Sequence, residues 1–283
     1  MKFIYFLIII TLSLFSQSAL SKTTKTLSEI LSFQDSYECN DKFPHHSYCK
    51  AVQFSAWSEQ DKKLVKGKLD QLERMAPAGM LDHFKDTLLK SAGKKLYRVS
   101  YSARWYVNRL ERKTYFSRNF TRPLLWVDPL TKVIGFMDHF FDREDFQDPS
   151  APIDKRSLNI FHELVHAFDI ANGHISTNDH FQKAVGWYWT GEDHEIKGID
   201  HQKLKADFDK YLAIAKEGDR EKSYQLMRQA GMKLGLPSLY SAFNSHECFA
   251  EFLTYYVFDP KAKDYMNDEV KKVLDDILLG KEI

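Results

Sequence analysis

The chain has 283 residues, of which 43% are apolar and 28% are charged, and its formal net charge at pH 7 is +1. This length and apolar content suffice for one sizeable hydrophobic core or two small ones. A net charge so close to zero gives no indication of nucleic acid or an acidic polymer as a partner, so no nucleic-acid partner is expected.

The first 21 residues predict a secretory signal peptide. Met1 and Lys2 precede the apolar run from Phe3 to Phe15, and a small-residue site ending at Ser21 follows it. The run is too short to span a membrane as a helix, and no cysteine follows it closely enough for a lipid anchor. We therefore expect cleavage near Ser21, a secreted or periplasmic protein, and no stable membrane anchor afterwards. An uncleaved anchor is the alternative.

Export changes the interpretation of the cysteines. Cys39 and Cys49 flank a turn-rich loop, and in an oxidising compartment they are expected to pair. A disulfide closing a loop of this length is expected to contribute about 2–3 kcal/mol to stability. Cys248 remains as the odd thiol.

Residues 22–93 predict a mainly helical N-terminal region. The polar stretch through residue 36 is expected to be flexible. A charged amphipathic helix is expected to open at Ser58 and end before Pro77, and a second helix to cover about residues 80–91.

Residues 94–122 combine basic side chains with interleaved aromatic ones. They include Lys94, Lys95, Arg98, Arg104, Arg109, Arg112, Lys113, Arg118 and Arg122 together with Tyr97, Tyr101, Trp105, Tyr106, Tyr115 and Phe116. Such a run forms either a surface for a polyanion or membrane, or strand and helix surface whose long basic side chains cover aromatic rings. The second interpretation is the commoner one.

Residues 124–136 predict a β-hairpin. The segments Leu124 to Val127 and Lys132 to Phe136 are apolar and are joined by the turn-forming pair Asp128-Pro129. An edge strand in such a position can hold an extended peptide by main-chain pairing.

An apolar helix is expected after this hairpin. Asp154 or Ser157 can cap its start, and Asn172-Gly173 supplies a left-handed stop. Apolar residues recur at helical spacing between these ends, namely Leu158, Phe161, Leu164, Val165 and Phe168. The helix therefore has a core-facing stripe, a start and an end.

This helix carries the pentapeptide His162-Glu163-Leu164-Val165-His166. Histidines at positions i and i+4 lie on one helical face, where both can bind one metal ion while Glu163 reaches a water on that ion. The pattern predicts a zinc-dependent hydrolase with His162 and His166 as ligands and Glu163 as general base. The alternative is two core histidines and a solvated glutamate.

A catalytic zinc ion needs a third protein ligand. One class of peptidase takes it from a histidine at position 172 and also needs a glycine at position 169, but this chain has Asn172 and Asp169, so that class is rejected. Glu247 and Glu251 offer another solution, because they lie one turn apart on a later helix that is largely apolar. Glu247 is expected to bind the metal, and Glu251 to accept the N–H of a ligating histidine.

Two further residues lie near these positions. Asp169, one turn after His166, is expected either to support a metal ligand from outside its coordination sphere or to be a surface charge at the helix end. Cys248 is expected to be a small buried apolar residue rather than a ligand, since neighbours on a helix point about 100° apart.

Residues 162–169 and 240–251 together resemble the gluzincin zinc metallopeptidases, to which the catalytic domain of anthrax lethal factor and its bacterial relatives belong. The matching residues are His162-Glu-Leu-Val-His166-Ala-Phe-Asp169 and Tyr240-Ser-Ala-Phe-Asn244-Ser-His-Glu247-Cys-Phe-Ala-Glu251. The resemblance implies zinc ligands at His162, His166 and Glu247, a base at Glu163, an oxyanion donor at Tyr240 and a supporting acid at Glu251.

The chain departs from that family in two places. Cys248 replaces a usually bulky or acidic residue, and the segment between His166 and Glu247 is longer than in lethal factor. Substrate specificity therefore does not transfer. Within this segment, residues 184–191 are aromatic and punctuated by glycine, and predict either a cleft wall or lid, or local packing. Two helices are expected, over 204–216 and 220–230.

Together these patterns predict an α+β protein with a zincin-like domain over residues 94–283. The expected function is an exported zinc metalloendopeptidase that binds one Zn²⁺ and acts on proteins or peptides. Peptidoglycan peptides are the alternative substrate, and a non-catalytic zinc-stabilised binding module is the alternative class. If Tyr240, Glu247 and Glu251 lay more than about 8 Å from the histidine pair, the zinc assignment would be lost, because zinc–ligand distances are only about 2 Å.

Overall fold

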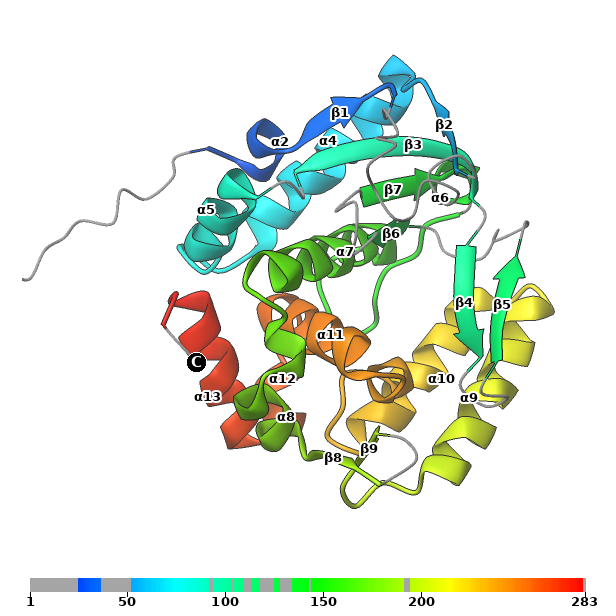
Figure 1. Cartoon of the computed structure of the whole chain (residues 1–283), viewed down its shortest axis with the longest axis vertical. Coiled ribbons are helices and arrows are strands. Elements are labelled where there is room, and N and C mark those ends of the chain that lie inside the picture. Colours follow the sequence, from blue (N-terminus) through cyan, green and yellow to red (C-terminus); the bar gives the residue numbers. More distant parts are fainter. Residues whose placement is uncertain are drawn as a thin grey trace, which may run out of the picture.

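The computed structural model describes residues 25–36, 52–91, 94–102, 104–108, 113–117, 125–127, 134–142, 144–190 and 194–281. The expected signal peptide and the Cys39–Cys49 pair lie outside these residues. The described part has a mixed α+β fold, as expected, with a small sheet at one end and helices filling the rest (Figure 1). Within it, no helix has the length and apolar character needed to cross a membrane.

The main sheet is built around β3 (Lys95–Ser102). One edge of β3 pairs with β1 (Ser32–Gln34, parallel) and β2 (Val52–Ser55, antiparallel), and the other with β7 (Ile134–Met137, parallel), which in turn pairs antiparallel with β6 (Leu125–Val127). All four residues of β7 are buried, as expected for a strand covered on both faces. The β6–β7 pairing confirms that these two segments form an antiparallel pair.

The expectation of a flexible stretch through residue 36 is wrong for its described part. Thr26 and Glu29 form a capping box that starts helix α2 (Leu27–Ile30), and β1 follows directly. Leu27 and Ile30 are buried in the core. Tertiary contacts thus order a segment whose polar composition, taken alone, indicated flexibility.

Two helices precede the central strand, as predicted. Helix α4 (Glu59–Met75) is capped by Ser58, whose side chain accepts from the Asp61 N–H at 3.0 Å, and α5 (Asp82–Lys90) follows. On α5, the ring of Phe84 stacks on Phe161 and Phe168, with centroids 5.0 and 4.9 Å apart. This contact fixes the N-terminal helices against α7.

Helices α7 (Lys155–Ala171) and α11 (Ser245–Phe258) pack against each other in the middle of the molecule (Figure 1). Asp154 caps α7 and Asn172 ends it, which confirms the predicted boundaries. Every residue of α11 from Cys248 to Phe258 is buried, so the prediction of a largely buried second helix is also confirmed.

The remaining elements surround these two helices. They are α6 (Asp138–Asp142), η1 (Ile175–Thr177), α8 (Asp179–Val185), β8 (Trp187–Trp189), β9 (His194–Ile196), α9 (His201–Lys216), α10 (Arg220–Met232), η2 (Leu239–Ala242), α12 (Ala262–Tyr265), α13 (Asp268–Leu278), and the hairpin of β4 (Arg104–Asn108) and β5 (Lys113–Ser117). Helices α9 and α10 confirm the two helices predicted between α7 and α11.

One hydrophobic core connects the N-terminal elements to the rest. It runs from Leu27 on α2 to Leu278 on α13 without a break in the contacts between buried side chains. Because β1 and β2 pair with β3, the described residues before 94 complete the same sheet as those after it.

Within the basic and aromatic segment 94–122, Arg98 fits the second interpretation, in which long basic side chains cover aromatic rings. Its guanidinium lies 4.1 Å above the Phe141 ring and donates to Asp61 at 3.2 Å. This side chain therefore covers an aromatic ring within the fold and is paired with carboxylates.

Candidate metal centre

Helix α7 brings His162 and His166 to one face. Apolar residues of α7 lie on the side that faces the N-terminal helices and also on the side that faces α11. Most of the helix is therefore buried. His162 is only 9% exposed, and the side chain of His166 is 14% exposed. The two imidazoles therefore lie between α7 and α11, and only a small part of each is exposed to solvent.

Helix α11 brings Glu247 to the same place. The Asn244 side chain caps this helix by accepting from the Glu247 N–H at 2.9 Å, which fixes Glu247 in the first turn. Ala250, one turn later, is fully buried, as expected for a small residue where two helices approach closely.

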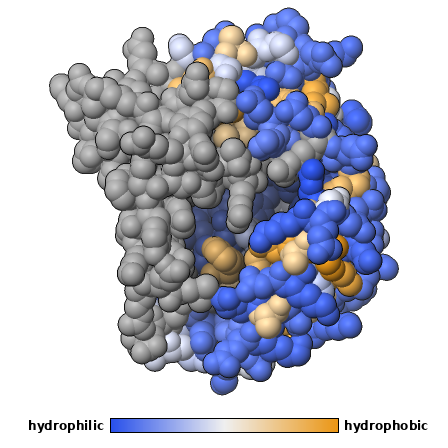
Figure 2. Space-filling view, turned by 90° about the vertical axis from the view of Figure 1, so that its right-hand side faces the viewer, coloured by the Kyte–Doolittle hydropathy of each residue, from blue (hydrophilic) through white to orange (hydrophobic). Residues whose placement is uncertain are grey.

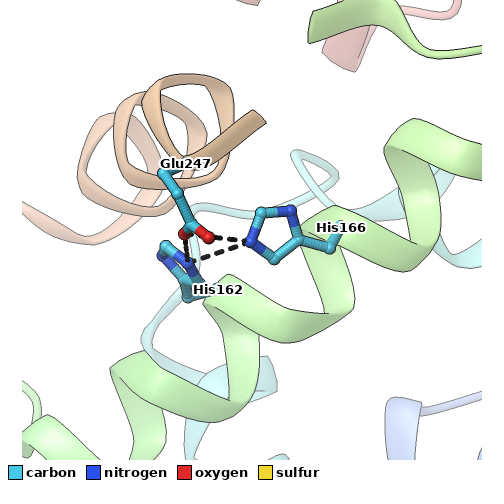
Figure 3. Close-up of side chains that lie close together, drawn as sticks. All are labelled: His162, His166 and Glu247. Carbon is cyan, nitrogen blue, oxygen red and sulfur yellow. Dashed lines mark hydrogen bonds and ion pairs between the residues drawn. The ribbon is translucent and has the colours of Figure 1, made fainter. Parts of the chain in front are cut away.

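The three side chains converge on one point (Figure 3). His162 Nε2 lies 3.0 Å from Glu247 Oε2 and 3.1 Å from His166 Nε2, and His166 Nε2 lies 3.3 Å from the same oxygen. Two ligands bound about 2.0–2.1 Å from one tetrahedral zinc ion are about 3.3–3.4 Å apart. The donor types and their spacing therefore fit a zinc ion held by two imidazoles and one carboxylate.

Glu251 lies on the other side of the His162 ring. Its Oε1 is 3.3 Å from His162 Nδ1, so a proton on Nδ1 is shared with the carboxylate and Nε2 is left facing His166 and Glu247. The second oxygen of Glu251 accepts from Ser238 Oγ at 2.5 Å. Glu251 is thus itself held in place, as predicted for a residue that orients a ligand.

Ser238 is a site residue that sequence reasoning missed. Its hydroxyl donates to Glu251 and accepts from the Tyr240 N–H at 3.1 Å, so it connects the orienting carboxylate to the turn η2. Its backbone packs directly on Gly231 of α10, where an added Cβ would lie 2.3 Å from the Ser238 carbonyl carbon. The serine before a short turn was the available signal, but only packing places it at Glu251.

The carboxylates dominate the electrostatics of this cluster. Burial opposes charge on His162, but hydrogen bonds to Glu247 and Glu251 outweigh it and raise the pKa of His162 to about 10. Burial likewise opposes charge on Glu247, yet the two histidines hold the pKa of that carboxyl well below its usual range. The carboxylates thus stabilise positive charge on the His162 ring, at the point where the three side chains meet.

Tyr240 and Glu163 flank the cluster. The Tyr240 ring centroid lies 6.3 Å from that of His162. Burial, the nearby charges of Glu247, Glu163 and Glu251, and a hydrogen bond to Glu247 raise the pKa of Tyr240 well above its ordinary value. The phenol therefore keeps its proton and can donate it in a hydrogen bond. Glu163 is close enough to raise the pKa of His162 as well as that of Tyr240.

A cluster of three neighbouring aromatic rings lies beside this point, and one of the rings is exposed at the surface. The ring of Tyr240 lies 5.7 Å from Phe243 and 6.4 Å from Phe208 of α9, both nearly parallel to it. Phe243 is 58% exposed. Figure 2 shows the side of the molecule that carries α9 and α10; among its coloured residues, apolar ones lie beside a hollow, and most of the others are hydrophilic.

Asp169 is neither a surface charge nor a partner of the two α7 histidines. It is 1% exposed, and among the described residues its carboxylate is bonded to Ser176 and to His246. The turn after α7 folds back over the helix end and covers Asp169, which one-dimensional spacing does not reveal. The expectation that Asp169 orients a metal ligand at the first cluster therefore has no contact to support it.

Two other expectations concern packing. Cys248 is fully buried, and burial raises the pKa of its thiol, so it is an inert apolar residue as expected. In the aromatic segment 184–191, Trp187 is buried in the core, whereas Tyr188 and Trp189 are 45% and 58% exposed. One ring packs locally, and the other two lie on the surface in the β8–β9 hairpin.

The structure thus brings together His162, His166, Glu247, Glu251 and Tyr240, all within the 8 Å limit set above. Comparison of the chain with protein-family models, with curated proteins and with solved structures found no match.

Proposed function

We propose that this protein is an exported zinc metallopeptidase of the gluzincin type that hydrolyses peptide bonds in proteins or peptides. The observation that carries the proposal is the convergence of His162, His166 and Glu247 at ligand spacing, from two helices 81 to 85 residues apart in sequence. The adjacent Glu163, next to one ligand in the chain, distinguishes the proposed peptidase from a structural zinc site, which has no use for a general base.

The geometry supports a division of roles among the residues of this chain. A zinc ion held by His162, His166 and Glu247 would act as a Lewis acid that activates water and polarises the substrate carbonyl. Glu163 accepts a proton from the water and delivers it to the leaving amine. Tyr240 donates its O–H to the carbonyl oxygen as negative charge develops there. Glu251 and Ser238 keep the His162 ring in the ligating orientation.

The surroundings favour an extended, partly apolar substrate. The exposed ring of Phe243 lies beside that of Tyr240, so an apolar substrate side chain can pack there while its carbonyl lies at Tyr240. Export follows from the signal peptide expected over residues 1–21, and localisation remains part of the proposal.

Metal content and peptide hydrolysis together test the proposal. After exhaustive dialysis, the wild-type protein is expected to retain a zinc ion that Glu247→Ala loses or binds far more weakly. Glu163→Gln is expected to keep the zinc and to hydrolyse a peptide library at least about 10²–10⁴-fold more slowly, because it lacks the base. Glu221→Gln, an exposed residue of α10, is the matched control.

Two outcomes would refute this function. Unchanged zinc in Glu247→Ala would mean that the third ligand is a different residue. A Glu163→Gln protein that hydrolyses peptides at the wild-type rate would exclude the mechanism, and zinc without any hydrolysis of peptides or peptidoglycan fragments would favour a binding module.

A further inference from the structure

A second group of potential metal ligands lies one turn beyond the first. It consists of Asp169 at the end of α7, His174 in the following turn, and His246 at the start of α11. Each offers one ligand atom, and these atoms lie within 4.8 Å of one another. The group is distinct from the first cluster, although His246 precedes Glu247 and Asp169 follows His166 by one turn of the helix.

The carboxyl group of Asp169 is held in one orientation by Ser176. Its Oδ1 accepts from the Ser176 N–H at 2.8 Å and its Oδ2 from Ser176 Oγ at 2.6 Å. Its Oδ2 also lies 3.3 Å from His246 Nδ1, which is about the spacing of two ligands on one tetrahedral zinc ion. The same nitrogen lies 2.6 Å from Ser176 Oγ, so an ion bound by Nδ1 replaces this contact. Among the described residues, no lysine or arginine pairs with this buried carboxylate.

His174 adopts a backbone conformation that is unusual for its type. Its φ and ψ are 67° and 62°, and among the described residues it is the one non-glycine residue with positive φ. The turn is held by the His174 N–H donating to Asp169 O at 2.9 Å and by the Thr177 N–H donating to His174 O at 3.0 Å. Such conformations concentrate at ligand-binding positions, because the surrounding contacts must enforce them.

The group is open to solvent on its histidine side. His174 is exposed and the His246 side chain is 45% exposed, with ring centroids 5.8 Å apart. An ion can therefore enter, and water can complete its coordination. Two imidazoles and one carboxylate suit zinc and similar first-row divalent ions rather than calcium or magnesium, which prefer oxygen ligands.

We infer that Asp169, His174 and His246 form a second divalent-metal site of zinc type. Ser176 orients Asp169 through its hydroxyl, as an outer-shell partner does in metal sites. An ion bound there joins the end of α7 to the start of α11, the two helices that carry the first cluster. The inference does not depend on peptidase activity.

Zinc stoichiometry separates the two sites. All variants are made in a His45→Ala/His46→Ala background, so that this histidine pair contributes nothing. Titration with zinc against a chromophoric chelator is expected to give two equivalents for the parent, one for His166→Ala, one for His174→Gly, and none for the combined variant. His180→Ala, which removes another exposed histidine, is expected to leave two.

Glycine at position 174 also separates a metal ligand from a backbone role. It relieves the left-handed conformation, so without zinc the melting temperature of His174→Gly should equal or exceed that of the parent. Zinc should raise the melting temperature of His166→Ala, because it binds the folded state, and should not raise that of the combined variant.

The inference is overturned if His174→Gly binds as much zinc as its parent, or if the second equivalent binds only at millimolar zinc. Loss of zinc in His166→Ala alone, with no effect of His174→Gly, would support the first site and remove the second. The reverse result would leave this inference standing and refute the proposed function.

Discussion

The two ends of α11 hold polar clusters of opposite design. At its start, His162, His166 and Glu247 bring together two imidazoles and a carboxylate, with Glu251 behind them. At its end, Asp259 meets the buried side chain of Arg228, whose guanidinium donates to it at 2.8 Å. The first cluster consists of groups that could hold a metal ion, whereas the second contains the guanidinium of Arg228.

The cluster around Arg228 is closed. The guanidinium lies 3.7 Å above the Tyr255 ring, also donates to Pro237 O and Ser150 Oγ, and has Asp148 as a second carboxylate at 3.9 Å. Arg228 is 1% exposed. A buried ion network of this kind has its charges compensated within the fold, so it is structural. The candidate metal centre differs from this network in two ways: its side chains are partly exposed, and among the described residues no lysine or arginine forms an ion pair with Glu247.

Removing the cation of the closed cluster is expected to have the largest effect. Arg228→Met leaves Asp148 and Asp259 buried without their partner, which is expected to cost about 3–5 kcal/mol of unfolding free energy. Urea denaturation measures this, with the exposed Arg220→Met as control. A loss below about 1 kcal/mol, the size of an average substitution, would show that the network is dispensable.

At the cluster of His162, His166 and Glu247, the substitution Tyr240→Phe tests the role of the tyrosine hydroxyl alone. The ring and its stacking remain, so kcat is expected to fall about 10²–10³-fold, as for loss of an oxyanion donor, with little change in zinc content. Steady-state kinetics on a cleaved peptide measure this, and Tyr211→Phe on α9 serves as the control. Unchanged kcat would assign Tyr240 to packing.

Glu251→Gln tests the support of a ligand. The amide no longer carries the charge that polarises the His162 ring, so zinc affinity is expected to fall about 10–100-fold while the fold survives. Chelator competition measures the affinity, and the exposed Glu269→Gln is the matched substitution. Equal affinities for wild type and Glu251→Gln would mean that the 3.3 Å contact has no influence on the metal.

The smallest expected effect is the change in the free energy of unfolding as the pH is lowered. Burial opposes charge on Asp148, but Tyr224 and Arg228 outweigh it and lower its pKa below the ordinary value. A carboxyl with a lowered folded-state pKa stabilises fully above its unfolded pKa, about 3.9, and loses that contribution as pH falls through the folded value.

Asp148→Asn is therefore expected to be less stable than wild type by about 1–3 kcal/mol at pH 7, the range for hydrogen bonds to charged groups. The difference should shrink below about pH 4, when wild type loses the charge as well. Urea unfolding of both proteins at pH 7, 5, 4 and 3 measures it. A difference in unfolding free energy that stays constant over this range would show that it does not come from the charge of Asp148.

Most of the helical framework was predictable because its signals are local. Asp154 as a cap, Asn172 as a stop and the apolar stripe between them predicted α7 closely, and the apolar residues after Glu247 predicted that α11 is buried. The separation of His162 and His166 by four residues places both on one face of any helix. These features depend on a few neighbouring residues.

The failures concern segments that other parts of the chain order. The residues around Leu27 are polar on average, but the burial of Leu27 and Ile30 in the core holds α2, and pairing with β3 forms β1. Asp169 has helical spacing from His166, yet the backbone reversal at His174 buries it against Ser176. Local propensity and hydrophobic periodicity predict neither the ordering around Leu27 nor the burial of Asp169. Both outcomes depend on contacts with other parts of the chain.

By itself, the sequence determined the donor types of the candidate centre, the helices that carry them and the class of fold, since each follows from local spacing. Tertiary structure alone decided that Glu247 meets the α7 histidines, that Ser238 holds Glu251, and that Asp169 turns toward His246. The physical reason is that these contacts join residues 7 to 85 positions apart. The packing of α7, η1 and η2 around α11 brings these residues within hydrogen-bonding distance.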